Sequence, residues 1–130
     1  MSIEKLIKVA KAMRNNSRAP YSKYKVGSSV ETNSGDIIGG CNIESSSYGL
    51  TCCAERIALY NAISLGHNKF IRLAVASENG AYPCGACRQI IWELCENIPV
   101  YIVDNNSNII NTTSKKLLPN PFDKKLLKEN

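Results

Sequence analysis

The stretch Pro83-Cys84-Gly85-Ala86-Cys87-Arg88-Gln89 places two cysteines at the start of an apolar helical segment. A second stretch upstream, Thr51-Cys52-Cys53-Ala54-Glu55-Arg56, supplies another cysteine at the start of a predicted helix. A catalytic zinc ion takes three protein ligands in a tetrahedron and leaves the fourth position to water. Cys53, Cys84 and Cys87 therefore form a candidate zinc site at the beginnings of two helices.

Glu55 is the candidate proton carrier of this site. It follows Cys53 by two residues, so it cannot easily bind the metal beside that cysteine. On the first turn of a helix, however, its carboxylate can lean over the open position and shuttle protons. The alternative is an acidic residue that merely favours the positive end of the helix dipole. Zinc deaminases of nucleobases use three cysteine ligands in some cases, with a non-ligand glutamate as acid and base.

Together with several further motifs, this pattern resembles the small, homotetrameric, zinc-dependent cytidine deaminases that act on free nucleosides. The resemblance covers nearly the whole chain, and its motifs occur in this order: Pro20-Tyr21-Ser22-Lys23-Tyr24, Asn42-Ile43-Glu44, Cys53-Ala54-Glu55-Arg56, Pro83 through Gln89, and Leu117-Leu118-Pro119. It implies hydrolysis of cytidine and 2′-deoxycytidine to uridine and 2′-deoxyuridine with release of ammonia, in pyrimidine salvage. It also implies one zinc ion per chain and a homotetramer with shared active sites.

The same resemblance suggests roles for five residues outside the metal ligands and Glu55. Arg56 would donate hydrogen bonds to the sulfurs and offset their charge. Asn42 and Glu44 would bind the 3′-hydroxyl of the sugar, and the carboxylate would repel phosphorylated sugars. Tyr24 stands where a phenylalanine usually walls the base. Phe122 matches an aromatic residue that stacks on the pyrimidine in a neighbouring subunit's site.

Other functions are weighed against this one. Lys25, Ser45 and Ser46 replace a proline and an Asn-Ala pair that are common in the family, so the sugar pocket could suit another substrate. The alternative substrate is another small aminated heterocycle, such as a blasticidin-like antibiotic nucleoside, although blasticidin-S deaminases depart from the Asn-x-Glu pattern. A non-catalytic zinc-binding or nucleic-acid-binding protein is less favoured, because a structural zinc site would be closed by a fourth ligand.

Length and composition predict one globular domain over residues 1–130, since 44% of the residues are apolar and 21% are charged. No apolar run is long enough to span a membrane. The N-terminal residues mix charges with apolar side chains, unlike a signal peptide, which predicts a cytoplasmic protein with reduced thiols. Cys41, Cys52 and Cys95 are then packing residues, and His67 is a helix cap or surface residue.

The net charge of +5 raises the possibility of a nucleic-acid partner. The basic residues recur at helical spacing beside apolar ones, which favours solvated helix faces, and no aromatic residues interleave with them to stack on bases. We therefore predict no nucleic-acid partner. The residues are Lys5, Lys8, Lys11, Arg14 and Arg18 near the N-terminus, and Lys115, Lys116, Lys124, Lys125 and Lys128 near the C-terminus.

Hydrophobic periodicity predicts an α/β fold with helices on both sides of a five-stranded mixed sheet. The predicted elements are a helix over 2–15 capped by Ser2, strands over 24–32 and 37–42, a largely buried helix over 53–65, a strand over 71–77, a second cysteine-bearing helix to about residue 97, and strands over 100–103 and 109–112. Residues 104–108 are too few for a parallel crossover, so the last strand should be antiparallel. By resemblance, this arrangement favours a free nucleoside, because relatives that act on tRNA, DNA or RNA insert a helix there.

Overall fold

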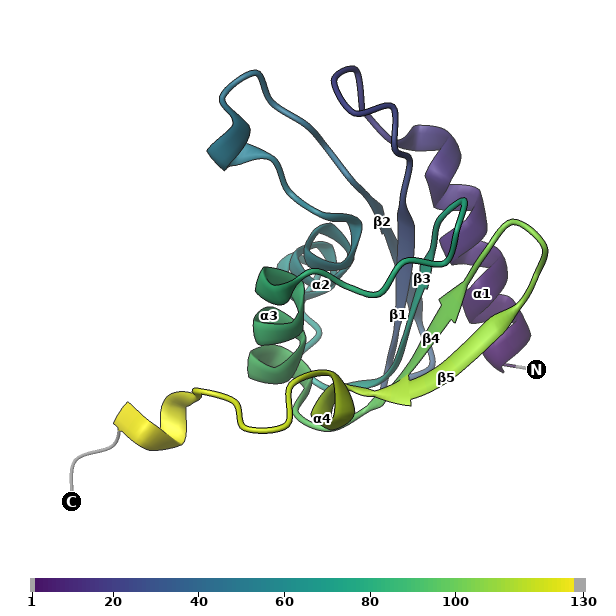
Figure 1. Ribbon diagram of the computed structural model, residues 1–130. Helices are drawn as coiled ribbons and strands as arrows, with labels where there is room; N and C mark the ends of the chain where they lie inside the picture. The colour runs from purple at the N-terminus through teal and green to yellow at the C-terminus, as the bar shows by residue number, and fades with distance from the viewer. Residues whose placement is uncertain (1, 128–130) are drawn as a thin grey trace.

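A computed structural model of the chain describes residues 2–127, except for the side chain of Ser2. Five strands form one sheet in the order β2-β1-β3-β4-β5 (Figure 1). They are β1 (Gly27–Thr32), β2 (Ile37–Cys41), β3 (Phe70–Ala76), β4 (Pro99–Val103) and β5 (Ile109–Thr113). Only β3 and β4 pair in parallel, whereas β5 returns antiparallel to β4. The predicted mixed sheet with an antiparallel last strand is confirmed.

Helices cover both faces of this sheet (Figure 1). Helix α1 (Ser2–Met13) packs on one face, while α2 (Ala54–Ser64) and α3 (Gly85–Cys95) lie together on the other. This is the predicted three-layer α/β/α arrangement. Shorter helical segments complete the chain: η1 (Arg14–Asn16), η2 (Tyr48–Leu50), α4 (Ser114–Leu117) and η3 (Lys124–Leu127).

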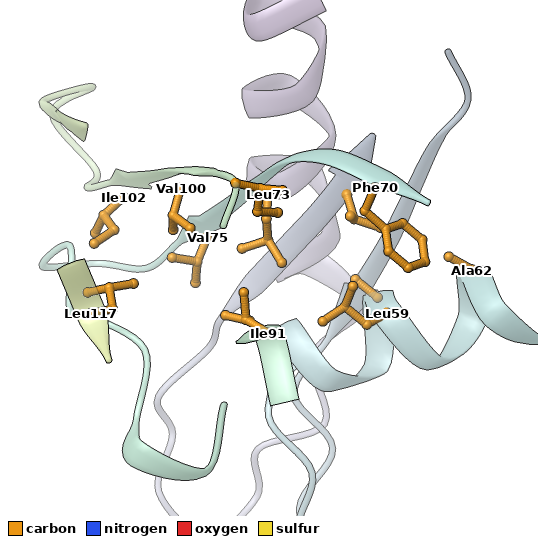
Figure 2. Packing of buried hydrophobic residues seen from close by; sticks show 12 residues of the cluster. Leu59, Ala62, Phe70, Leu73, Val75, Ile91, Val100, Ile102 and Leu117 are labelled. Carbon is orange, nitrogen blue, oxygen red and sulfur yellow. The ribbon is translucent and has the colours of Figure 1, made fainter. Parts of the chain in front are cut away.

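The central strand β3 explains why two layers of helices can form. Successive side chains of a strand point to opposite faces. Leu73 and Val75 therefore join the larger core beneath α2 and α3, while Ala74 and Ala76 meet α1 on the other side (Figure 2). The larger core also includes Leu59 from α2. The core residues labelled in Figure 2 come from α2 and α3, from β3 and β4, and from α4.

Glycines allow two of the helices to lie directly against the sheet. A Cβ atom at Gly27 would sit 2.0 Å from the carbonyl oxygen of Ala10 in α1. One at Gly40 would sit 2.3 Å from the backbone nitrogen of Ala58 in α2. Any larger residue at Gly40 would push α2 away from β2. Since Cys53 and Glu55 lie at the start of α2, this contact also fixes their height above the sheet.

Two of the sequence predictions need correction. The strand predicted from residue 24 begins only at Gly27, because Tyr24 and Val26 bind the side chain of Asn42 instead of a partner strand. The helix predicted to be largely buried is buried on one face only, since α2 covers the sheet with a single side. Tyr60, Ile63 and Leu65 are 43%, 42% and 67% exposed.

The remaining element predictions hold within one to three residues at each end. Helix α1 stops at Met13, two residues earlier than expected, and α3 ends at Cys95 rather than near residue 97. The sequence did not predict α4. Capping by Ser2 and the basic residue Lys128 lie outside the described side chains.

The basic residues are only partly the solvated helix faces that were predicted. Lys5 and Lys8 on α1 are exposed. Lys11, however, donates a hydrogen bond to Ser107, and Arg14 donates to Asn105 and to the backbone of Lys25. The C-terminal lysines are exposed but are divided between α4 and η3 instead of following one helix.

Candidate active site

Three cysteine thiols meet where α2 and α3 begin. Cys53 is the residue before α2, Cys84 is the residue before α3, and Cys87 lies in the first turn of α3. The Sγ atom of Cys84 lies 3.7 Å from that of Cys53 and 3.4 Å from that of Cys87, and all three lie within 4.8 Å of one another. Three sulfurs bound at about 2.3 Å to one zinc ion in a tetrahedron would be about 3.8 Å apart. The residues present therefore fit a zinc ion.

The surroundings favour a thiolate at Cys53 and a neutral thiol at Cys87. Two helix N-termini converge on the sulfurs, and the positive end of a helix dipole stabilises a thiolate. Neither Cys53 nor Cys84 caps its helix with a side-chain hydrogen bond, so their sulfurs remain available to a metal. The pKa of Cys53 falls to about 5, mainly through its hydrogen bond with Cys87 and further through Arg56, while burial opposes the change. The pKa of Cys87 is raised by the same hydrogen bond and by burial.

Arg56 is the cation beside this cluster. Its Nη2 atom donates to the sulfur of Cys53 over 3.5 Å. The buried Nε atom has no hydrogen-bond partner among residues 2–127, so the main interaction of the guanidinium group is with the sulfurs. Three thiolates around a divalent ion would carry one net negative charge, and Arg56 is placed to offset it.

Replacing Arg56 with alanine is expected to leave zinc bound and to lower kcat by about 10- to 100-fold, the usual cost of losing an outer partner of a metal ligand. The reason is that the three sulfur ligands remain while the charge that balances them is removed. Zinc per chain and kcat should be measured on the same sample. Arg56→Lys is the matched control because it keeps the charge and loses the planar fork. Unchanged turnover in Arg56→Ala would contradict the assignment.

Glu55 lies on the first turn of α2, between the thiols and a cavity. Its side chain is only 4% exposed. Burial raises the pKa of Glu55 to about 7, the thiolate of Cys53 adds to the effect, and Arg56 opposes it. A carboxyl group with a pKa near the working pH can both accept and donate a proton, which is the property required of a general acid and base.

A cavity of about 280 Å³ joins the metal cluster to the polar residues after β2. Cys53, Glu55 and Cys84 line it together with Asn42 and Glu44. This volume is close to the lower limit of about 300 Å³ for small-molecule pockets. The structure thus brings the predicted proton carrier and the predicted sugar-binding residues to one cavity of the size of a small ligand.

Asn42 and Glu44 hold the wall of this cavity in place. The side chain of Asn42 donates to Tyr24 O over 2.7 Å and accepts from Val26 N over 3.0 Å and from the Ser17 hydroxyl. One carboxylate oxygen of Glu44 accepts from the backbone N–H groups of Tyr21 and Ser22, and the other accepts from the Ser22 hydroxyl.

These contacts favour the ionised form of Glu44. The hydrogen bond from the Ser22 side chain is the largest of several that lower the pKa of Glu44. The Glu44 side chain is therefore a carboxylate at neutral pH, and its hydrogen bonds hold it in a fixed orientation in the cavity wall.

The two predicted aromatic residues lie in different places. Tyr24 is half-buried in the cavity wall, and its hydroxyl donates to the side chain of Asn79. Phe122 is 57% exposed and is not among the residues that line this cavity. A role for Phe122 in catalysis would thus require the cavity of another subunit.

Several residues at the cavity were not singled out from the sequence. Tyr82 lies in a loop and carries no local pattern that marks a site, and Ser22 lies within the Pro20–Tyr24 motif but was given no role. Ser77 directly follows β3 and is 2% exposed, and its hydroxyl accepts from Ala81 N over 3.1 Å. A polar residue at the end of an apolar strand is the one signal that could have indicated Ser77. Arg88 donates to Pro83 O over 2.7 Å and so fixes the turn before Cys84.

The six cysteines are all free thiols, and those outside the cluster behave as packing residues. Cys41 is buried, while Cys52 and Cys95 are half-buried. Burial raises the pKa of Cys95 to about 12, so its thiol stays neutral. His67 lies at the end of α2, as predicted, with its backbone N–H donating to Ala62 O.

Among residues 2–127, no helix is both long enough and apolar enough to cross a membrane.

Comparisons with known proteins agree with this geometry. The family model "Cytidine and deoxycytidylate deaminase zinc-binding region" matches residues 1–104. A cytidine deaminase of Sporosarcina psychrophila is 46% identical over 127 residues, which cover 95% of this chain and 93% of that protein. The crystal structure of cytidine deaminase from Burkholderia pseudomallei superimposes with a TM-score of 0.90 at 41% identity, covering 94% of this chain and 100% of the other.

A protein of the alternative class is more distant. The blasticidin-S deaminase of Bacillus cereus is 30% identical over 107 residues, which cover 75% of this chain and 76% of that protein. The match to the family model spans the positions of the three clustered cysteines and of Glu55. The chain belongs to the cytidine and deoxycytidylate deaminase family and carries its zinc-binding region.

Proposed function

We propose that this protein is a zinc-dependent hydrolase that converts cytidine and 2′-deoxycytidine to uridine and 2′-deoxyuridine with release of ammonia. The observation that carries the proposal is the shared cavity. Glu55, two of the three candidate zinc ligands and the Asn42–Glu44 pair all line it. An aminated base beside Glu55 and its sugar beside Glu44 would fill it.

Glu55 is the residue that moves protons in this proposal. Zinc held by Cys53, Cys84 and Cys87 would activate a water molecule by lowering its pKa toward about 7. The Glu55 carboxylate would accept the proton that this water loses and deliver it to N3 of the cytosine ring. It would then take the remaining proton of the hydroxyl group added at C4 and pass it to the amine, which leaves as ammonia. Its burial supports the role, because a group with a pKa of about 7 can do both.

Glu44 in the cavity wall would select a nucleoside over a nucleotide. The Glu44 carboxylate is ionised and held by three hydrogen bonds to residues 21 and 22, so it can accept from a ribose hydroxyl without moving. A phosphate group on the sugar would be repelled by the same charge. Asn42 supports this wall indirectly, because its amide already holds the Tyr24–Val26 segment.

The working assembly in this proposal is a homotetramer with shared active sites. Two observations support it. Tyr60 and Ile63 of α2 and Leu65 directly after it are exposed in the single chain and would be covered by a second copy. Phe122 lies outside the cavity of its own chain and would stack on the base in a neighbouring one.

A place in pyrimidine salvage follows from the proposed substrates, which are nucleosides released when nucleic acids are degraded. A cytoplasmic location suits the metal site, because three uncrosslinked thiols must stay reduced to bind zinc. Lys25, Ser45 and Ser46 are the positions at which this chain departs from its family, and an antibiotic nucleoside is therefore the alternative substrate.

The proposal is tested by following the ultraviolet absorbance of zinc-loaded protein with cytidine, cytidine monophosphate and blasticidin S in parallel. We expect conversion of cytidine and at least about fivefold lower kcat/KM with the monophosphate, since one unfavourable charge contact costs about 1 kcal/mol or more. Equal rates on cytidine and its monophosphate would refute the role of Glu44. No conversion of cytidine, with one zinc ion per chain in the same sample, would refute the proposed substrate.

A further inference from the structure

The last described part of the chain, residues 118–127, is here called the C-terminal arm. It leaves α4 and extends away from the body of the molecule (Figure 1, yellow). Its apolar side chains are solvent-exposed in the single chain: Phe122 is 57% exposed, Leu126 66% and Leu127 69%. The path of the arm is therefore not set by burial in its own core.

Polar side chains of α3 hold the arm instead. Arg88 donates through Nη1 to Leu117 O over 3.1 Å, at the root of the arm. Gln89 donates through Nε2 to Phe122 O. The indole N–H of Trp92 donates to Asp123 Oδ2 over 3.0 Å. Residues three and four apart lie on the same side of a helix, so these donors form one row along α3.

The contacts with Phe122 and Asp123 matter because little else fixes the arm at that point. A cavity of about 120 Å³ remains between α3 and the arm, lined in part by Trp92 and Asp123. A segment that packs loosely depends on its few hydrogen bonds for its position. Asp123 also accepts from Lys125 N over 3.0 Å, which turns the chain after Phe122 into η3.

We infer that Trp92 and Asp123, supported by Gln89, are positioning residues that present Phe122 to the substrate cavity of a neighbouring subunit. This inference rests on the proposed function, in which Phe122 stacks on the base in that cavity. The helix that carries the row also directly follows Cys84 and contains Cys87. The metal-bearing helix of one subunit would thus set the base contact in the next.

The test compares three variants of the arm in the zinc-loaded protein. Asp123→Ala removes the acceptor, Asp123→Asn keeps an oxygen that Trp92 can bind, and Asn120→Ala changes an exposed arm residue as the control. We expect Asp123→Ala to raise KM for cytidine by about threefold to tenfold with kcat within about twofold, as suits the loss of one hydrogen bond. Asp123→Asn and Asn120→Ala should keep the original KM.

The single tryptophan gives an independent readout of the contact. Because Trp92 is the only indole, its fluorescence reports directly on the arm. We expect the emission of Asp123→Ala to shift to the red, since the half-buried ring becomes more exposed to water, and that of Asn120→Ala to stay unchanged. An unchanged KM in Asp123→Ala would overturn the inference, whether or not the emission shifts.

Mixed assemblies show whose cavity the arm serves. Chains with Glu55→Gln have no proton carrier but an intact arm, whereas chains with Asp123→Ala have the reverse. Refolding the two together should restore the original KM in part of the active sites if the arm acts on a neighbour. If KM stays at the Asp123→Ala value in every mixture, the arm acts within its own chain and the inference is wrong.

A variant of Phe122 separates failure of this inference from failure of the proposed function. Stacking of a base on an aromatic ring contributes about 1–3 kcal/mol, so Phe122→Ala should raise KM by at least about fivefold. If Phe122→Ala raises KM and Asp123→Ala does not, the positioning role alone is refuted. If Phe122→Ala has no effect while cytidine is converted, the proposed stacking is refuted, and the positioning role falls with it.

Discussion

The Glu55→Gln variant is expected to bind zinc and cytidine as the original protein does, with kcat lower by at least about 10²-fold. Glutamine has nearly the same shape as glutamate but cannot accept and return a proton. Glu55 is not one of the three cysteines that could bind zinc, so its replacement leaves all three sulfur ligands in place. Zinc per chain, equilibrium binding of cytidine and kcat should be measured on one preparation.

The comparison with Glu55→Asp sharpens this test. Aspartate keeps a carboxyl group but withdraws it by one methylene, and a proton carrier must lie within hydrogen-bond reach of the atoms it serves. We expect a large loss in that variant as well. A Glu55→Gln variant that retains most of its turnover with full zinc content would remove Glu55 from the mechanism.

The same variant should change stability in the metal-free protein. Burial raises the pKa of Glu55 to about 7 from its usual 4.5, so the folded chain binds this proton more tightly than the unfolded chain. Stability from this group is therefore lost as pH rises from about 4.5 to 7, and at pH 8 the cost reaches at most about 3 kcal/mol. Metal-free Glu55→Gln should unfold at a higher temperature than the metal-free original at pH 8. The difference should vanish near pH 4.5.

Removal of one metal ligand is the second change with a large expected effect. The Cys87→Ser variant should lose zinc and all measurable activity. A serine hydroxyl does not ionise at neutral pH and does not replace a thiolate as a zinc ligand. Loss of an outer hydrogen-bond partner alone costs up to about 100-fold in metal affinity, so loss of a ligand should exceed that. Competition with a zinc-binding dye measures the affinity directly.

Cys95→Ser is the matched control for that experiment. Cys95 lies in the same helix, α3, and packs against the larger core, but it is not part of the cluster of three thiols. Its replacement should reduce stability modestly and leave zinc content and kcat unchanged. Equal zinc affinity in Cys87→Ser and Cys95→Ser would rule out Cys87 as a ligand.

Local sequence patterns determined the chemistry of this protein. Ligand spacing on helix starts is a local property, so Cys84 and Cys87 could be paired from the sequence, and Glu55 could be placed relative to Cys53. The direction of β5 also followed from local information, because the loop over 104–108 is too short for a crossover. The resemblance to a known family then supplied the candidate roles of Asn42, Glu44, Tyr24 and Phe122, which spacing alone did not contain.

Tertiary structure decided the features that depend on contacts between distant segments. Asn42 binds Tyr24 and Val26 across the hairpin, which moves the start of β1 and could not be read from periodicity. The exposed face of α2 could not be predicted because its apolar residues occur on most sides of the helix, and periodicity does not tell which apolar side chains are buried. The bond between Trp92 and Asp123 joins residues far apart in the chain, where no spacing rule applies. Sequence thus fixes which groups are available within one turn or strand, whereas long-range packing decides which of them meet.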